Sequence, residues 1–317
     1  MSTILVAVDG TPKGLEAVSI LGRQVKNRED LRLVLLHCVQ QVATLLPGDL
    51  CLDLESDCKF AAIDQEKIGN AVLKESLNRL TEAGFPKQKV DLRLMADSMD
   101  PAQDILTAAD RENIRTIVLG RRGRSQVENL LLGSVSSKVA QYSRDKTVWI
   151  VDTPINETKK VLIALEGVPE SRKLSQYTAD SIAVPADDLD YTFLHLMPPI
   201  PPTFWDDGHI LDAAEQRDRL GRMEKWKVDW LARVNSLMAE ARDMLLAKGI
   251  PREKTDTMIV PTRQGVARDL LSEIEEHKFQ MVVMGKRSFH ERKPFLMGSH
   301  AAKVLHNAKG TILCLVD

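Results

Sequence analysis

The sequence has 317 residues, of which 44% are hydrophobic and 28% charged, as in globular proteins with ordinary cores. At about 150 residues per domain, this length predicts two domains. The formal net charge of −2 provides no basic surface for nucleic acid or an acidic membrane, so neither is expected as a partner.

No segment predicts export or membrane insertion. The N-terminal apolar run is short, lacks a preceding basic region and ends at Asp9, unlike a secretory signal. No apolar run approaches the ~18 residues that a membrane helix needs. Free thiols are expected at the four cysteines, which show no paired or zinc-site spacing: Cys38, Cys51, Cys58 and Cys314. The sequence therefore predicts a cytoplasmic protein.

The first half alternates strands and helices. Short apolar or alternating runs predict strands at 3–8, 31–38, 89–95, 115–119 and 147–151. Helices are predicted between them at 12–26, 63–84, 101–112 and 133–143, with a polar loop at 45–60. Continuous apolar strands alternating with helices predict a parallel sheet that is covered on both faces. Right-handed crossovers make such a sheet doubly wound.

The second half repeats the first, because four pairs of segments recur in the same order. The pairs lie 157 to 165 residues apart: Asp9 and Glu166, His37 and His195, Gly120 and Gly285, Gly133 and Gly298. Strands are expected at 160–165, 190–196, 255–260, 280–284 and 311–316, and a long helix at 211–248. The sequence predicts domains over 1–152 and 159–317, joined by a short polar linker.

Candidate binding residues of the first half follow two strands. Open α/β sheets bind ligands beyond the carboxyl ends of their strands. Asp9 ends the first strand, and Gly120-Arg-Arg-Gly123, nine further residues and Gly133-Ser134 follow the fourth. Glycines allow a sharp turn and a close approach to an anion, and the N–H groups of a helix start attract phosphate. Phosphate oxygens can accept from Ser134 and Ser136, and Asp9 can bind ribose hydroxyls or a phosphate-bound Mg²⁺.

Each of these features has a purely structural alternative. Glycines after strands often serve tight turns, and an aspartate there is often a helix N-cap. Arg121, Arg122 and Arg124 offer charge-assisted contacts to phosphate, but arginines in a surface loop are more often solvated. We interpret His37 and His195 as hydrogen-bonded core residues. The occurrence of the aspartate and the glycines together, at this spacing, favours a nucleotide site.

The G-x2-G-x9-G-S pattern after a strand, with an aspartate ending the first strand, resembles the ATP-binding class of the universal stress protein family. The resemblance covers nearly the whole chain, twice. It implies two tandem doubly wound parallel five-stranded sheets of the adenine nucleotide α-hydrolase-like fold, packed as a pseudo-two-fold dimer through strands 147–151 and 311–316. It further implies that the Val39 backbone binds the adenine edge. The residues expected to bind ATP with Mg²⁺ are Ala7, Val8, Asp9, Val39, Leu119, Gly120, Arg122, Gly123, Gly133, Ser134, Val135 and Ser136.

The second half departs from this pattern. Glu166 replaces the aspartate, Ser288 the second glycine, Met197-Pro198 the pair Val39-Gln40, and His300 the residue Val135. Ser288 adds a Cβ where the backbone must approach phosphate, and Pro198 lacks an N–H donor. The sequence therefore predicts a weak or absent second nucleotide site. The proline-rich segment 197–210 and the pair Trp226 and Trp230 serve either internal packing or a partner surface.

Two functions follow as expectations. The first is a stress-response regulator that binds ATP or another adenine nucleotide in its first half. The alternative is a nucleotide-independent scaffold or interaction protein with an unidentified protein partner. No Gly-x-x-x-x-Gly-Lys-Ser/Thr loop or nucleophile triad is found, so at most slow ATP hydrolysis or autophosphorylation at Ser134 or Ser136 is expected. A homodimer is the default for a symmetric assembly.

Overall fold

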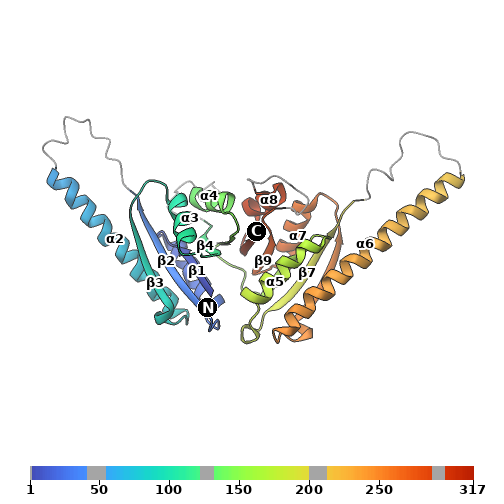
Figure 1. Cartoon of the computed structure of the whole chain (residues 1–317), viewed down its shortest axis with the longest axis horizontal. Coiled ribbons are helices and arrows are strands. Elements are labelled where there is room, and N and C mark those ends of the chain that lie inside the picture. The colour runs from blue at the N-terminus through green and yellow to red at the C-terminus, as the bar shows by residue number, and fades with distance from the viewer. Residues whose placement is uncertain (1, 41–54, 122–131, 200–212, 288–296) are drawn as a thin grey trace.

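A computed structural model describes residues 2–40, 55–121, 132–199, 213–287 and 297–317 (Figure 1). These residues form one ten-stranded sheet with the order β3-β2-β1-β4-β5-β10-β9-β6-β7-β8. The first half contributes β1 Ser2–Ala7, β2 Leu31–Gln40, β3 Val90–Ser98, β4 Thr116–Gly120 and β5 Thr147–Val151. The second half contributes β6 Lys160–Ala164, β7 Asp190–Met197, β8 Thr255–Pro261, β9 Met281–Gly285 and β10 Ile312–Val316.

The two halves meet along the antiparallel pair β5–β10, which we call the seam. Ile312 pairs with Val151 at one end of the seam and Leu315 with Val148 at the other. The pairs within each half are parallel. Every residue of β5 and β10 is buried, because each strand is covered on both faces and paired on both edges. The predicted pairing of the last strands within one chain is confirmed.

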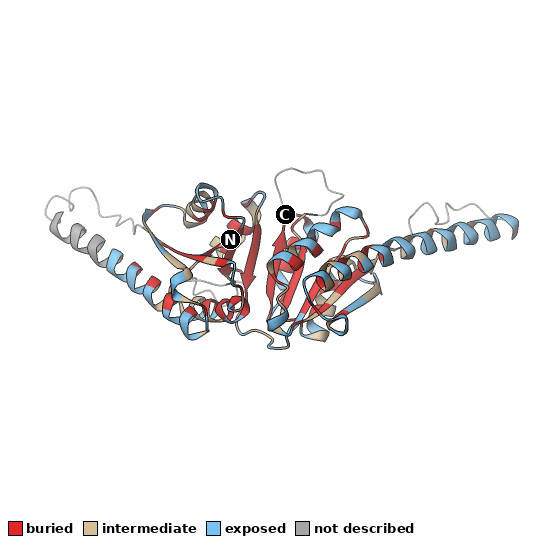
Figure 2. Cartoon of the chain, turned by 60° about the horizontal axis from the view of Figure 1, so that its bottom comes forward, coloured by how far each residue is buried: buried red, intermediate tan, exposed pale blue. Residues whose placement is uncertain are grey.

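Helices cover both faces of the sheet, as expected for a doubly wound fold. One face carries α1 Pro12–Val25, α2 Glu55–Glu82, α5 Arg172–Ser181 and α6 Ala213–Ala247. The other carries α3 Pro101–Arg111, α4 Ser134–Tyr142, α7 Val266–His277 and α8 Ser299–Asn307. Figure 2 shows the buried strands between helices whose outer surfaces are exposed. Each core layer contains residues of both halves, so neither core ends at the seam.

Two long helices extend from the opposite ends of the molecule (Figure 1). α2 begins at Glu55, inside the segment 45–60, for which a polar loop is predicted. Acidic residues are favourable in the first turn of a helix, where they interact with the positive end of its dipole, so the acidic composition of this segment does not indicate a loop. In α6, the first turns after Ala213 are largely exposed and lie beyond the sheet (Figure 2).

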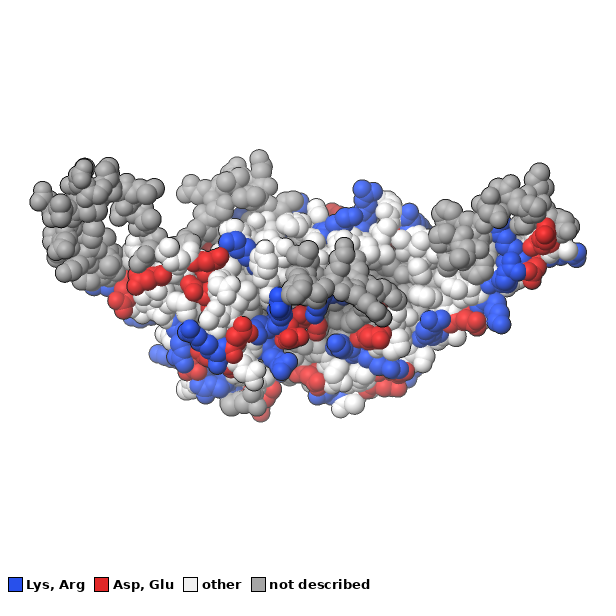
Figure 3. All heavy atoms as spheres, turned by 45° about the horizontal axis from the view of Figure 1, so that its top comes forward, with Lys and Arg blue, Asp and Glu red and all other residues white. Residues whose placement is uncertain are grey.

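The surface has no large region of one charge on the face shown in Figure 3, where basic and acidic side chains are intermingled. This distribution agrees with the small net charge. None of the helices in the described part of the chain combines the length and the apolar character that crossing a bilayer requires. Cys51 and most of the proline-rich segment 197–210 lie outside the described residues.

Candidate functional site

The predicted binding residues of the first half lie at the carboxyl edge of the sheet, where the strand order reverses. Ala7 at the end of β1 pairs with Leu36 of β2 on one side and Leu119 of β4 on the other. The chain fills the sheet from β1 towards β3, and then from β4 towards β5. A reversal of this kind leaves a crevice outside the carboxyl ends of the strands, which is the usual ligand position in open α/β sheets.

The turn after β1 holds Asp9 in a fixed position. Asp9 Oδ1 accepts hydrogen bonds from the Thr11 backbone N–H at 3.0 Å and from the Thr11 hydroxyl at 2.8 Å. Thr11, and not Asp9, is the N-cap of α1, because its hydroxyl accepts from Gly14 N at 3.0 Å. A Cβ at Gly14 would lie 2.2 Å from Asp9 Oδ1, so the carboxylate packs directly on the first turn of α1. The helix-capping alternative for Asp9 is therefore wrong.

Val39 lies near the end of β2, beneath α2. The regular pairing of β2 with β3 is interrupted between Cys38 and Gln40, so Val39 sits at an irregularity in the ladder. A Cβ at Gly69 of α2 would lie 2.9 Å from Val39 Cγ2, which shows how closely the helix approaches the strand. His37 is buried, and its Nδ1 lies 2.6 Å from Val8 O, which confirms its interpretation as a hydrogen-bonded core residue.

The glycine motif joins the end of β4 to the start of α4. Gly133 N donates to Arg121 O at 2.9 Å, and the Ser136 hydroxyl donates to Gly120 O at 2.7 Å. Gly133 is the N-cap of α4 and makes no side-chain capping hydrogen bond. Ser134, the first helical residue, is exposed, whereas Ser136 is buried and its hydroxyl stabilises the motif itself.

The structure therefore brings together most of the predicted set at one edge. Strand ends and the first turn of α4 contribute Ala7, Val8, Asp9, Val39, Leu119, Gly120, Gly133, Ser134, Val135 and Ser136. Val135 packs against the core beneath α4. Arg122 and Gly123, together with Arg124, lie outside the described residues.

Arg121 is neither solvated, as the sequence favoured, nor directed at a phosphate position, so both interpretations are wrong for this residue. Its side chain is only 2% exposed and donates from Nη2 to His306 O at 2.7 Å, in the last turn of α8. Arg121 Nε lies 4.0 Å from Asp152 Oδ1. A cation at a helix C-terminus interacts favourably with the helix dipole. Arg121 therefore connects the first-half motif to the second half.

Lys286 makes the reciprocal contact from the second half. It follows Gly285 as Arg121 follows Gly120, and its Nζ donates to Ser143 O and, at 2.9 Å, to Ser143 Oγ. Ser143 is the C-cap of α4. Burial lowers the pKa of Lys286 to about 8. This exchange was not predicted, although two basic residues directly after the repeated glycines are the signal in the sequence that could have indicated it.

The equivalent edge of the second half contains a pocket of about 250 Å³. The ends of β6, β7 and β9 and the start of α8 surround it. Most of its lining is apolar, and the polar members are Glu166, His195, Ser299 and His300. Gly298, the N-cap of α8, has the same extended backbone conformation as Gly133 and also lacks a side-chain cap.

Trp230 of α6 forms one wall of this pocket. Its indole N–H donates to His195 Nε2 at 3.0 Å, and His195 Nδ1 lies 2.9 Å from Leu165 O. The imidazole is therefore neutral with its proton on Nδ1, and burial lowers its pKa. A Cβ at Gly167 would lie 2.6 Å from Trp230 Cζ2, so the indole packs against the turn after β6. Trp226 lies 5.8 Å from Trp230 between ring centroids, which supports the packing interpretation of this pair.

Comparisons with known proteins agree with this architecture. The model of the universal stress protein family matches residues 1–152 and 157–315. A universal stress protein of Methanothermobacter thermautotrophicus is 39% identical over 75 residues, which are 24% of this chain and 49% of that protein, so the match spans about half of that relative. The universal stress protein YxiE of Bacillus subtilis is 30% identical over 142 residues, covering 44% of this chain and 92% of that protein.

A solved structure shows the same fold over the whole length. A universal stress protein from Archaeoglobus fulgidus superposes with a TM-score of 0.60 and 18% identity, over 99% of this chain and 96% of that one. The family match extends over both halves, and the observed sheet has the predicted doubly wound topology twice. The chain therefore belongs to the universal stress protein family, as a member with two family domains in tandem.

Proposed function

We propose that the first half binds an adenine nucleotide, ATP with Mg²⁺, and that the protein acts as a regulator in a stress response. The observation that carries the proposal is the uncapped start of α4, at the same edge of the sheet as Asp9. Gly133 has φ −67° and ψ 147°, a conformation open to any residue, so backbone geometry does not explain a glycine there. The missing Cβ leaves the free N–H groups of the first helical turn accessible to a phosphate.

The remaining residues of this edge suit the other parts of a nucleotide. Ala7 and Leu119 are neighbours across β1 and β4 and offer apolar contacts to an adenine or ribose ring. The irregular pairing at Val39 interrupts the ladder where a base edge would hydrogen-bond to the backbone. Asp9 supplies a carboxylate at a fixed position for ribose hydroxyls or for Mg²⁺, which would neutralise part of the phosphate charge.

Calorimetric titration with ATP and Mg²⁺, after removal of any nucleotide that co-purifies, tests the proposal. We expect one ATP per chain. Gly133→Val should abolish binding, because its side chain would occupy the approach to the helix N-terminus. Gly298→Val is the matched control: the backbone conformation is the same, so the cost to folding should be similar, and binding should be retained.

Two other results would change this interpretation: the first would change the expected stoichiometry, and the second would overturn the proposal. Two ATP molecules per chain would mean that the second-half pocket also accepts the nucleotide, despite Trp230 and the changed motif. No heat and no thermal shift with ATP, AMP or related nucleotides would mean that the first-half motif is only a structural relic. The nucleotide-independent scaffold would then be the better description.

A further inference from the structure

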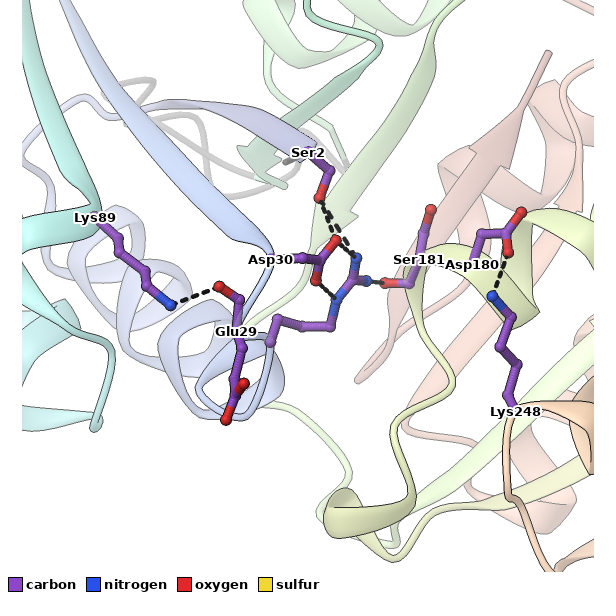
Figure 4. Close-up of polar contacts among 8 residues, drawn as sticks. Ser2, Glu29, Asp30, Lys89, Asp180, Ser181 and Lys248 are labelled. Carbon is purple, nitrogen blue, oxygen red and sulfur yellow. Dashed lines mark hydrogen bonds and ion pairs between the residues drawn. The ribbon is translucent and has the colours of Figure 1, made fainter.

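A groove of about 1030 Å³ lies at one end of the seam, away from both glycine motifs. The amino ends of β1, β4 and β5 form one side, and α5 with the end of β10 forms the other. Arg28 stabilises one wall of the groove. Its Nε lies 3.0 Å from Asp30 Oδ1, and its guanidinium also donates to the Ser181 carbonyl of α5. Figure 4 shows Asp30 and Ser2 of the first half facing Ser181 across this contact.

The internal repeat provides a counterpart for this groove in the second half. Asp145 N donates to Asp317 Oδ2 at 2.9 Å, and 165 residues later Gly310 N donates to Asp152 Oδ2 at the same distance. Asp145 and Gly310 both have positive φ, 52° and 64°, as do Asn113 and Lys278, with 51° and 54°. The two surfaces therefore share these backbone features at equivalent positions of the repeat.

In the second half, the linker between the halves covers this surface. Asn156 N donates to Gly310 O at 2.7 Å, and the Thr158 hydroxyl donates to Lys278 O at 2.7 Å. Ile155, which lies in the sequence between β5 and these two contacts, packs against the core. The linker thus supplies two hydrogen-bond donors and one partly buried apolar side chain to this surface.

In the first half, the equivalent surface lines the groove and is not covered by a peptide of the described residues. Within the described part of the chain, no donor reaches the carbonyl of Asp145 or Asn113, the counterparts of Gly310 and Lys278. Arg115 is exposed where its counterpart Gln280 is only half-exposed. Thr311 is 1% exposed under the linker, whereas its counterpart Lys146 is partly exposed.

We propose that this groove binds a short peptide segment of a partner protein, in the manner of the linker. The segment would donate to the carbonyls of Asp145 and Asn113 and place an apolar side chain against the ends of the strands. An acidic residue fits as well, because Arg115 and Lys173 line the groove without an ion pair to any described residue. The Arg28 contacts fix the wall in advance, which reduces the ordering cost of binding.

Nuclear magnetic resonance on the ¹⁵N-labelled full chain tests the proposal. The probe is the linker sequence as a blocked peptide, acetyl-Thr-Pro-Ile-Asn-Glu-Thr-amide. We expect saturable shifts of the amides of Asn113, Arg115 and Lys146. A peptide with aspartate in place of isoleucine should bind at least tenfold more weakly. Arg115→Glu should weaken binding of the original peptide, and Lys303→Glu, an exposed change on α8, should not.

A second experiment attaches the same six residues to the chain after Asp317, which gives them an effective concentration of roughly millimolar. A peptide that binds too weakly to be seen when free should then bind, whereas a groove that does not bind peptide should stay unchanged. Groove amides that shift in neither format would overturn the proposal. Shifts that follow protein concentration without peptide, accompanied by a dimeric mass, would overturn it as well, because the occupant would then be a second copy of the chain.

Discussion

At the scale of single residues, the buried cations Arg121 and Lys286 are the most informative feature. Each follows the first glycine of its motif, and each contacts the C-terminal turn of the last helix in the other half. For Arg121, its position in the sequence favoured a solvated loop residue, with a phosphate contact as the alternative. The direction of these side chains depends on a helix that lies about half a chain away in the sequence, so local reasoning could not predict it.

The pH dependence of stability should report the burial of Lys286. The pKa of Lys286 is about 8 in the folded protein and 10.5 when unperturbed. Between these values the unfolded chain binds more protons, so the free energy of unfolding rises with pH and falls as pH is lowered towards 8. Relative to Lys286→Met, the natural protein should gain up to about 1.4 kcal/mol per pH unit in this range.

Urea unfolding at pH 8 and pH 10 measures this difference. Lys303→Met is the control, because it removes a lysine that is exposed on α8. An equal pH response of both variants would show that the Lys286 ammonium is not destabilised by burial.

At the scale of secondary structure elements, α2 and α6 offer a matched pair of glycines. A Cβ at Gly69 would lie 2.6 Å from Leu94 Cδ1 and 2.9 Å from Val39 Cγ2, whereas Gly221 has no atom within 4 Å of such a Cβ. Gly221→Ala should stabilise the protein by up to about 1 kcal/mol through helix propensity alone. Gly69→Ala should destabilise it, because overpacking typically costs about 1–3 kcal/mol.

Thermal unfolding of the two variants tests this expectation, and ATP titration adds a second measurement. Because Gly69 packs on Val39, Gly69→Ala should also weaken ATP binding, while Gly221→Ala should leave it unchanged. If both substitutions stabilise the protein to a similar extent, α2 does not pack on β2 as closely as described.

Most elements could be predicted from the sequence, because a strand that is buried on both faces is a continuous apolar run. Val148, Trp149 and Ile150 of β5 are such a run, and all are buried. The start of α2 could not be predicted, because a polar and acidic segment is compatible with both a loop and an exposed helix.

In the candidate site, the residues that follow predicted strands could be placed together at the carboxyl edge of the sheet. The second-half pocket could not be predicted, because its wall comes from Trp230, on a helix far from the motif.

At the scale of the whole molecule, the seam makes one folding unit of two similar domains. Trp149 and Cys314 belong to the core on one face, and Ile150 and Leu313 to the core on the other. Separation of the halves would expose two fully buried strands and their unpaired backbone groups. The sequence predicted this pairing, while association of two chains into a homodimer stays a prediction.

The full chain should therefore unfold in one cooperative transition. Tryptophan fluorescence, far-ultraviolet circular dichroism and calorimetry should give the same midpoint, since the halves share both core layers. The separate segment 1–158 serves as a comparison: it should dimerise through β5 or aggregate. Two resolved transitions in the full chain would mean that each half is stable without the seam.

The pairing of β5 with β10 inside one polypeptide also has an evolutionary consequence. In a homodimer, every substitution appears on both sides of the two-fold axis, so a change that benefits one site is imposed on the other. Fusion of the two copies removes this constraint. Asp9 and Glu166, or Arg121 and Lys286, are inherited separately, and one half can keep an ancestral site while its duplicate acquires another use. The seam preserves the symmetry of the scaffold while each site evolves independently.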